Sequence, residues 1–267
     1  MDNRPIGVFD SGLGGISTLR QAIKALPNES FLYYGDCINA PYGGKSEAEL
    51  RVLTHAACAK LVDNGAKALL IACNTTVVAV GDELREAFDV PIVGIKPPVE
   101  FASKTPGEGL VLVMATQTTT RLLLERAKSE GRLWPERAVP IPCPGEMVAR
   151  VERGMFERGD YDDLFHELFA PYAAKAVDAI VLGCTHYPFI QEEVFRYAKE
   201  NFQGDPLFFD GGMFAVEELK NTLNSKGLQS ETGVSSTTFM TSGDYERMKA
   251  LFDLLLNVHV PMRGIAL

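Results

Sequence analysis

Hydrophobic residues along the chain fall into two alternating patterns. Short apolar runs rich in Ile and Val predict buried strands, and the segments between them place apolar residues at helical spacing. The predicted strands cover residues 6–9, 31–34, 68–71, 91–95, 110–114, 139–141, 179–182, 206–210 and 237–241. This alternation favours an α/β fold in which parallel sheets are flanked by helices.

Helical patterns fill most of the gaps between these strands. The clearest start is a Ser-x-x-Glu capping box at residues 46–49, which opens a helix to about residue 64. Other helices are predicted over 161–177 and 214–226. The alternation breaks at the double proline 97–98 and then starts again. We place a domain boundary there, because units of roughly a hundred residues are an ordinary domain size.

Two of the predicted strands end in the same way. Residues 68–73 (ALLIAC) and 179–184 (AIVLGC) align without a gap, as an apolar run, a small residue and a cysteine. Small polar residues follow each cysteine. The runs are too short for helices, so each is predicted to be a buried strand that delivers a thiol to its carboxyl end.

Composition narrows the class of protein. The 267 residues are 46% hydrophobic and 23% charged, as in ordinary globular proteins, and are enough for a large core. A net charge of −9 without any Lys/Arg run argues against nucleic acid. No apolar run approaches a membrane span, and the N-terminus lacks a signal-peptide pattern. Five widely spread cysteines predict free thiols, so we expect a cytoplasmic protein.

Open parallel sheets bind ligands outside the carboxyl ends of their strands. The loops predicted at this position are 10–11, 73–75, 116–118 and 184–186. If the two halves are related by a pseudo-twofold axis, Cys73 and Cys184 face each other across an interdomain cleft. We therefore expect the active site in that cleft, between two pseudo-symmetric domains.

A pair of thiols on opposite sides of a carbon has a specific chemistry. A free thiol has a pKa of about 8.5, which a helix N-terminus or a cation lowers. Both cysteines precede predicted helix starts, where free backbone N–H groups favour an anion. A thiolate can remove a proton from one face of the carbon while the opposite thiol returns one to the other face. This is stereoinversion by general acid–base catalysis.

Neighbouring residues are candidates to assist the thiols. His186 lies two residues after Cys184 and could take its proton or stabilise its thiolate. Asp10 is the candidate partner of Cys73, and Glu152 could orient His186. Neutral donors for the carboxylates of a substrate are Ser11, Tyr42, Gly43, Asn74, Thr75 and Thr185.

Four motifs together resemble a known family. They are Asp-Ser-Gly at 10–12, Pro-Tyr-Gly at 41–43, Cys-Asn-Thr at 73–75 and Leu-Gly-Cys-Thr-His-Tyr-Pro at 182–188. In this combination and order they resemble the bacterial glutamate racemases of the aspartate/glutamate racemase superfamily, and the resemblance runs from residue 6 to at least 210.

The resemblance implies a cofactor-independent racemase that makes D-glutamate for peptidoglycan, usually as a homodimer. The histidine after Cys-Thr favours glutamate over aspartate. The chain tail is implied to fold back, giving one domain of 1–97 plus 207–267 and another of 98–206. The implied catalytic residues are Cys73, Cys184, Asp10, His186 and Glu152. The implied substrate contacts are Asp10, Ser11, Pro41, Tyr42, Gly43, Cys73, Asn74, Thr75, Cys184, Thr185 and His186.

Other readings of the same residues stay open. The chain could be a two-domain module that binds an amino acid, or an acyl-transfer enzyme with one nucleophilic cysteine and His186 as base. Asp10 could only cap the first helix, and Glu152 could be a solvated helix charge. Cys37, Cys58 and Cys143 are expected to be core residues.

The motifs of common cofactors are incomplete. The glycines at 12–15 lack the last glycine of a dinucleotide fingerprint, and Gly-Lys-Ser at 44–46 lacks the opening glycine of a P-loop. Cys184 and His186 are separated by one residue, without a Cys-x-x-Cys pair for zinc. No lysine is marked out as a pyridoxal site. We therefore expect neither a metal nor a cofactor.

Overall fold

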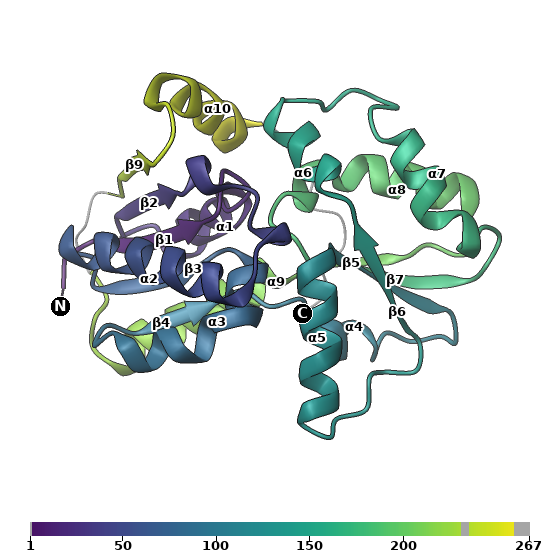
Figure 1. Cartoon of the computed structure of the whole chain (residues 1–267), viewed down its shortest axis with the longest axis horizontal. Helices are drawn as coiled ribbons and strands as arrows, with labels where there is room; N and C mark the ends of the chain where they lie inside the picture. The colour runs from purple at the N-terminus through teal and green to yellow at the C-terminus, as the bar shows by residue number, and fades with distance from the viewer. Residues whose placement is uncertain (1, 231–234, 259–267) are drawn as a thin grey trace. The chain divides into compact units, whose positions relative to one another are not determined.

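The computed structural model of the chain describes residues 2–230 and 235–258 (Figure 1). These residues divide into two compact units, a first unit of 2–96 with 212–258 and a second unit of 97–211. Each unit contains one parallel sheet flanked by helices, so the predicted α/β class is confirmed. In the described part of the chain, no helix is long and apolar enough to span a bilayer.

The first unit has a five-stranded sheet whose strands are all parallel. In spatial order they are β4 (Ile92–Gly94), β3 (Ala68–Ile71), β1 (Ile6–Asp10), β2 (Phe31–Gly35) and β9 (Thr237–Thr241). The helices are α1 (Ile16–Ala25), α2 (Glu47–Asp63), α3 (Asn74–Ala87), α9 (Gly211–Ser225) and α10 (Tyr245–Asn257). The predicted capping box is present, with Ser46 and Glu49 each accepting the other's backbone N–H.

The order of the strands decides which helices share a face. The chain steps from β1 to β2 in one direction and returns past β1 to β3 and β4. Because parallel crossovers are right-handed, this reversal puts α1 on the face opposite α2 and α3. The contacts agree, since α2 packs beside α3 and α1 packs against α10.

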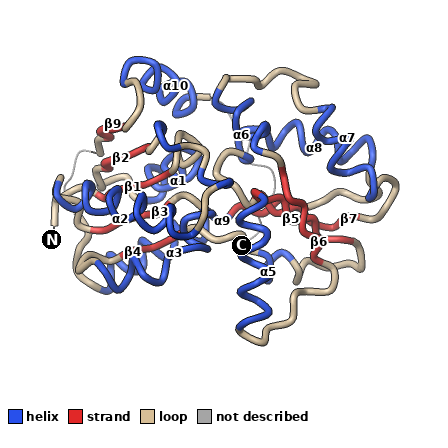
Figure 2. The backbone as a smooth tube through the Cα atoms, viewed as in Figure 1, coloured by secondary structure: helices blue, strands red, loops and turns tan. Residues whose placement is uncertain are grey.

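The second unit has a four-stranded parallel sheet. Its strands in spatial order are β6 (Ala138–Cys143), β5 (Leu110–Thr116), β7 (Val177–Leu182) and β8 (Leu207–Asp210). Its helices are α4 (Val99–Ala102), α5 (Gln117–Ser129), α6 (Gly145–Glu152), α7 (Asp162–Phe169) and α8 (Gln191–Asn201). Figure 2 shows α6, α7 and α8 on one side of this sheet and α4 and α5 on the other.

Both faces of the second sheet are apolar. Alternate residues of β5 and β7, such as Val113 and Val181, pack against α4. An aromatic group beneath α7 and α8 includes Phe165, Phe169 and Tyr197, whose rings lie 5.6 to 5.8 Å apart. A sheet covered on both faces needs strands that are apolar throughout, which explains why these strands lack polar alternation.

The two sheets repeat one topology. In the first unit four strands run β4-β3-β1-β2, and in the second four run β8-β7-β5-β6, so β3 corresponds to β7. The hydrogen bonds also correspond, because Ala72 N–H donates to the Phe9 carbonyl and Gly183 N–H donates to the Met114 carbonyl, each at 2.7 Å. A Cβ at Gly183 would lie 2.7 Å from the Met114 oxygen, so glycine is required there.

Two predictions about the fold are corrected. The strand at 207–210 was expected in the first domain, but β8 pairs with β7 and the second unit continues to residue 211. Residues 259–267 of the predicted tail lie outside the described part of the chain. The helix predicted over 161–177 ends at Phe169, because Pro171 breaks it and Ala174 has a φ of 58°. Residue 177 already belongs to β7.

A buried ion pair joins the amino ends of the first sheet's strands. Lys67 Nζ lies 2.5 Å from Glu29 Oε2, and the two side chains are 0% and 3% exposed. Lys67 also donates to the Asp2 carbonyl, and Glu29 accepts the Ser230 N–H. These contacts connect the segments that precede β1, β2 and β3 with residue 230 of the chain's last part.

Breaking this pair should destabilise the first unit strongly. Lys67→Met leaves the Glu29 carboxylate buried without its cation, which is expected to lower the free energy of unfolding by about 3–5 kcal/mol. Urea unfolding followed by circular dichroism measures the change. The double variant Lys67→Met/Glu29→Leu should recover part of the loss, and a single variant as stable as the wild type would contradict the prediction.

Candidate active site

The first thiol lies at the carboxyl edge of the first sheet. Cys73 comes two residues after β3 and is the residue that precedes α3, and it is 5% exposed. Its Sγ lies 3.6 Å from the hydroxyl of Ser11, which follows the neighbouring strand β1. The structure therefore brings together two residues that the sequence placed at adjacent strand ends.

Asp10 ends β1 and is fully buried. Its Oδ2 accepts the N–H of Gly12 at 2.9 Å. Helix α1 begins at Ile16 and has no side-chain cap. Asp10 therefore supports the loop after β1 and is not the cap of the first helix.

The ionisation of Cys73 is shifted towards the neutral thiol. Burial, followed by the negative charge of Asp10, raises the pKa of Cys73 to about 11. Hydrogen bonds with Thr76 and Ser11 act in the opposite direction and are the smaller effects. In the absence of ligand, Cys73 is therefore a proton donor at neutral pH.

This shift predicts how Cys73 reacts with an alkylating agent. With a pKa of about 11, about one thiol in a thousand is ionised at pH 8, so the rate of alkylation by iodoacetamide should rise about tenfold for each pH unit up to 10. Asp10→Asn keeps a hydrogen-bond acceptor for Gly12 but removes the charge, and should accelerate the reaction at pH 8. Peptide mass spectrometry resolves each cysteine. The buried Cys58 is the internal control, and an unchanged Cys73 rate in Asp10→Asn would contradict the assigned cause.

Tyr42 lies in the loop that follows β2. It is 1% exposed, and its hydroxyl donates to Asp36 Oδ2 at 2.6 Å. Asn39 donates its amide to both carboxylate oxygens of Asp36, at 3.0 and 3.1 Å. The phenol proton is therefore already used within the protein, and the substrate contact expected of Tyr42 stays a prediction. Burial and the contact with Asp36 raise the pKa of Tyr42 above the ordinary value of a tyrosine.

Asp36 is a residue that the sequence analysis missed. It is 4% exposed and holds the two side chains that shape the loop after β2. The signal was available, because Asp36 lies two residues after the predicted strand 31–34 and so at the same carboxyl edge as Asp10. Pro41, in the same loop, is exposed, and Gly43 is half-buried.

Asn74 and Thr75 form the first turn of α3. Both residues are 4% exposed. Neither the oxygen nor the nitrogen of the Asn74 amide has a hydrogen-bond partner among the described residues. Leaving a buried amide unsatisfied is costly, so its position beside Cys73 is suited to binding a polar ligand.

The second thiol lies at the equivalent edge of the second sheet. Cys184 comes two residues after β7 and is 8% exposed. Its Sγ lies 3.7 Å from Nδ1 of His186. The Nε2 atom of the same ring lies 3.0 Å from Oε1 of Glu152, the last residue of α6. Glu152 is therefore in contact with His186 and is not only a solvated helix charge.

His186 is 2% exposed and lies between an acid and a thiol. Burial alone would lower its pKa, but the contacts with Cys184 and Glu152 outweigh it and raise the pKa of His186 well above the usual value. The imidazolium is therefore the favoured form at neutral pH. Thr185, between the two residues, is 4% exposed.

Two of the three other cysteines are core residues, as predicted. Cys58 and Cys143 are buried, and burial raises the pKa of each thiol to about 12. Cys37 is half-buried, so the prediction that it is a core residue is wrong. All five cysteines are free. Within the described residues, no group of three His, Cys, Asp or Glu side chains is arranged to hold a metal ion.

Each unit thus carries one thiol in a topologically equivalent position, with its own acid or base beside it. Such a pair of groups suits proton transfer at a substrate. The sequence model of the Asp/Glu/Hydantoin racemase family matches residues 16–219 of the chain. The chain belongs to this family.

Curated members of the family are similar over most of their length. The glutamate racemase of Clostridium perfringens strain 13 is 41% identical over 235 residues, which are 87% of this chain and 88% of that protein. The glutamate racemase of Clostridium botulinum strain Alaska E43 is 36% identical over 258 residues, covering 95% and 97%.

Solved structures of the family share the fold. The crystal structure of glutamate racemase from Francisella tularensis in complex with D-glutamate gives a TM-score of 0.80 at 29% identity, covering 97% of this chain and 95% of that one. The glutamate racemase from Thermus thermophilus in complex with beta-chloro-D-alanine gives 0.79 at 30% identity, covering 100% and 99%.

Proposed function

We propose that this chain is a glutamate racemase that interconverts L- and D-glutamate with Cys73 and Cys184 as its acid/base pair. The observation that carries the proposal is the repeated thiol, which follows β3 in one sheet and β7 in a second sheet of the same topology. A binding module needs no matched thiols, and a nucleophilic enzyme needs one. Relatives that are 36–41% identical and carry the name glutamate racemase support the choice of substrate.

The reaction has two steps, and one proton moves in each step. A thiolate takes the α-hydrogen as a proton, and the electrons of the Cα–H bond stay on the substrate as a carbanion. The opposite thiol then gives its proton to the other face, so that the thiol and thiolate have exchanged places. The reverse reaction starts from the exchanged state, which is why two groups of the same chemistry suit both directions.

The side chains beside the thiols give the resting enzyme a defined starting state. Burial, followed by the Asp10 charge, raises the pKa of Cys73 and keeps its proton on the sulfur. The cationic His186 lies 3.7 Å from Cys184 Sγ, where it can exchange a proton with that sulfur, and Glu152 balances the cation. We propose that Cys73 starts as the acid and Cys184 as the base, with Asp10 and His186 assisting proton transfer.

The substrate carboxylates are proposed to bind neutral donors. Ser11 contacts the first thiol, Asn74 and Thr75 follow it in the chain, and Thr185 follows the second thiol. The unpartnered amide of Asn74 gains a hydrogen bond when a ligand is present. Because Tyr42 is engaged with Asp36, this loop is proposed to act through Pro41, Gly43 and its backbone rather than through the phenol.

Incubation of L-glutamate with the protein in deuterated water tests the proposal. The racemase should place deuterium at the α-carbon, seen by the loss of the α-proton NMR signal, while the optical rotation decays to zero. Aspartate, run side by side, should react much more slowly. A protein that binds glutamate without exchange would overturn the proposal.

We also propose the setting in which the enzyme works. The product D-glutamate would supply peptidoglycan synthesis in the cytoplasm, and the enzyme would act without a cofactor as a homodimer. Expression of the chain should restore growth of a bacterium that requires added D-glutamate. Activity should survive dialysis against EDTA, and light scattering should give the mass of two chains.

A further inference from the structure

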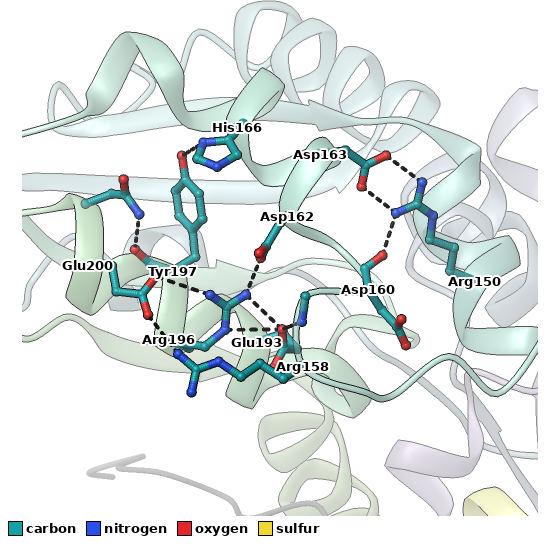
Figure 3. A network of polar contacts seen from close by, with 12 residues as sticks. Arg150, Arg158, Asp160, Asp162, Asp163, His166, Glu193, Arg196, Tyr197 and Glu200 are labelled. Atoms are coloured by element: carbon teal, nitrogen blue, oxygen red, sulfur yellow. Dashed lines mark hydrogen bonds and ion pairs between the residues drawn. The ribbon is translucent and has the colours of Figure 1, made fainter.

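A network of charged side chains includes Arg150 of α6, the helix that carries Glu152, and residues of α7 and α8 (Figure 3). Arg150, two residues earlier on α6, forms a two-pronged ion pair with Asp163 of α7. Its Nη1 and Nη2 atoms lie 2.6 and 2.7 Å from the two carboxylate oxygens. Nη1 also donates to the Asp160 carbonyl at 2.5 Å. Only 15% of the Arg150 side chain is exposed, whereas 64% of the Asp163 side chain is.

A second arginine ties α7 to α8. Arg196 of α8 forms an ion pair with Asp162, the neighbour of Asp163. It also donates to Glu193 on its own helix at 2.9 Å, and Glu193 accepts the N–H of Gly159 at 2.9 Å. The loop between α6 and α7 is therefore held from α8 as well as from Arg150.

These contacts form a closed ring with the candidate site. Helix α8 follows the short turn Tyr187–Ile190, which starts directly after His186. From His186 the ring runs along the chain to Arg196, across to α7, across again to Arg150 and along α6 to Glu152. The ring closes where Glu152 Oε1 meets His186 Nε2 at 3.0 Å. All of its members belong to the second unit.

Glu152 needs such support. It is the last residue of α6, where the helix dipole disfavours a carboxylate, and its side chain is 29% exposed. A small rotation of α6 would let the carboxylate turn into water. Arg150 holds the same turn of the helix with a planar, two-pronged contact that fixes orientation as well as distance.

We propose that Arg150 is a positioning residue for the Cys184 side of the site. Through its ion pair with Asp163 it fixes the end of α6 so that Glu152 stays in contact with His186. The inference rests on the proposed racemase function for its kinetic consequence, but the contact itself is a property of the protein without substrate.

Two variants break the contact from opposite sides. Arg150→Gln and the exposed Asp163→Ala are each expected to lower kcat roughly 10- to 100-fold, because misplacement of a catalytic group by about an ångström has effects of this size. KM should change less than twofold, since neither residue belongs to the proposed substrate contacts. Arg150→Lys keeps the positive charge but cannot form the two-pronged contact with Asp163, so it should give an intermediate kcat. Arg158→Gln removes an exposed ion pair with Glu200 in the same region and should leave kcat unchanged.

An NMR titration of His186 supplies a readout that does not depend on activity. In substrate-free protein the pKa of His186 should fall in Arg150→Gln and Asp163→Ala and stay constant in Arg158→Gln. In kinetics, Arg150→Gln added to Glu152→Gln should cause no further loss, since both act through one contact. A loss that adds fully to that of Glu152→Gln, an unchanged His186 titration or an unchanged kcat would each overturn the inference.

The outcomes separate this inference from the proposed function. If the wild type fails to exchange the α-hydrogen of glutamate, the proposed function fails while the His186 titration still decides the role of Arg150. If the wild type racemises glutamate and the Arg150 and Asp163 variants match it, only the role of Arg150 fails.

Discussion

Cys73→Ala and Cys184→Ala should each reduce racemisation of glutamate by roughly a thousandfold or more in both directions. Each variant leaves one face of the α-carbon without a proton donor or acceptor, so inversion stops although one thiol remains. Polarimetry from either enantiomer measures the loss. Circular dichroism and urea unfolding should show intact folds, since each substitution removes a single sulfur atom from an otherwise unchanged strand end.

A matched control separates loss of a base from loss of a buried sulfur. Cys58 is fully buried in α2 of the first unit, and Cys58→Ala should retain most activity. A single remaining thiol can still remove and return a proton on its own face. Each catalytic variant should therefore exchange deuterium slowly into one enantiomer, and the two variants should select opposite enantiomers. Normal turnover in either variant would remove the two-thiol mechanism.

His186→Asn should lower kcat by roughly 100- to 1000-fold, the range for loss of a positioned acid or base. The ring 3.7 Å from Cys184 Sγ would no longer be available to assist proton transfer at that sulfur, and the contact between His186 and Glu152 would be lost. Glu152→Gln keeps the histidine and should cost less. Steady-state rates for both enantiomers measure the effects, and a His186→Asn variant within threefold of the wild type would contradict the assignment.

The raised pKa of His186 also links stability to pH. A group that binds its proton more tightly in the folded state stabilises the fold fully below its unfolded pKa of about 6.5, and this contribution is lost as pH rises through the higher folded pKa. The free energy of unfolding of the wild type should therefore fall from pH 6 towards alkaline pH. In His186→Asn, the part of this decrease in the free energy of unfolding that is due to His186 should be absent. Urea titrations at several pH values compare the two proteins, and identical pH dependence would contradict the raised pKa.

Features with local causes could be predicted from the sequence. The strand before each cysteine was predicted because a short, entirely apolar run is typical of a buried strand. The strand 237–241 was predicted with the bounds that the structure has. The capping box at Ser46 was predicted because both of its hydrogen bonds join residues three apart.

Partner choice between distant segments could not be predicted. The apolar sequence of β8 would suit either sheet, and only its pairing with β7 assigns the strand to the second unit. The hydroxyl of Tyr42 finds Asp36 because the loop folds back on the end of β2. The role proposed for Arg150 depends on α7 and α8, whose approach to α6 leaves no periodic signal in the chain.

The sequence by itself determined the α/β class, the two equivalent thiols and the candidate residues beside them, since these follow from local hydrophobic patterns and short motifs. The tertiary structure alone decided which strands share a sheet, that burial and then the Asp10 charge raise the pKa of Cys73, and that Glu152 contacts His186. The reason is physical. Amphipathic periodicity is set by neighbours along the chain, whereas strand pairing, burial of charge and side-chain contacts are set by residues tens to hundreds of positions apart.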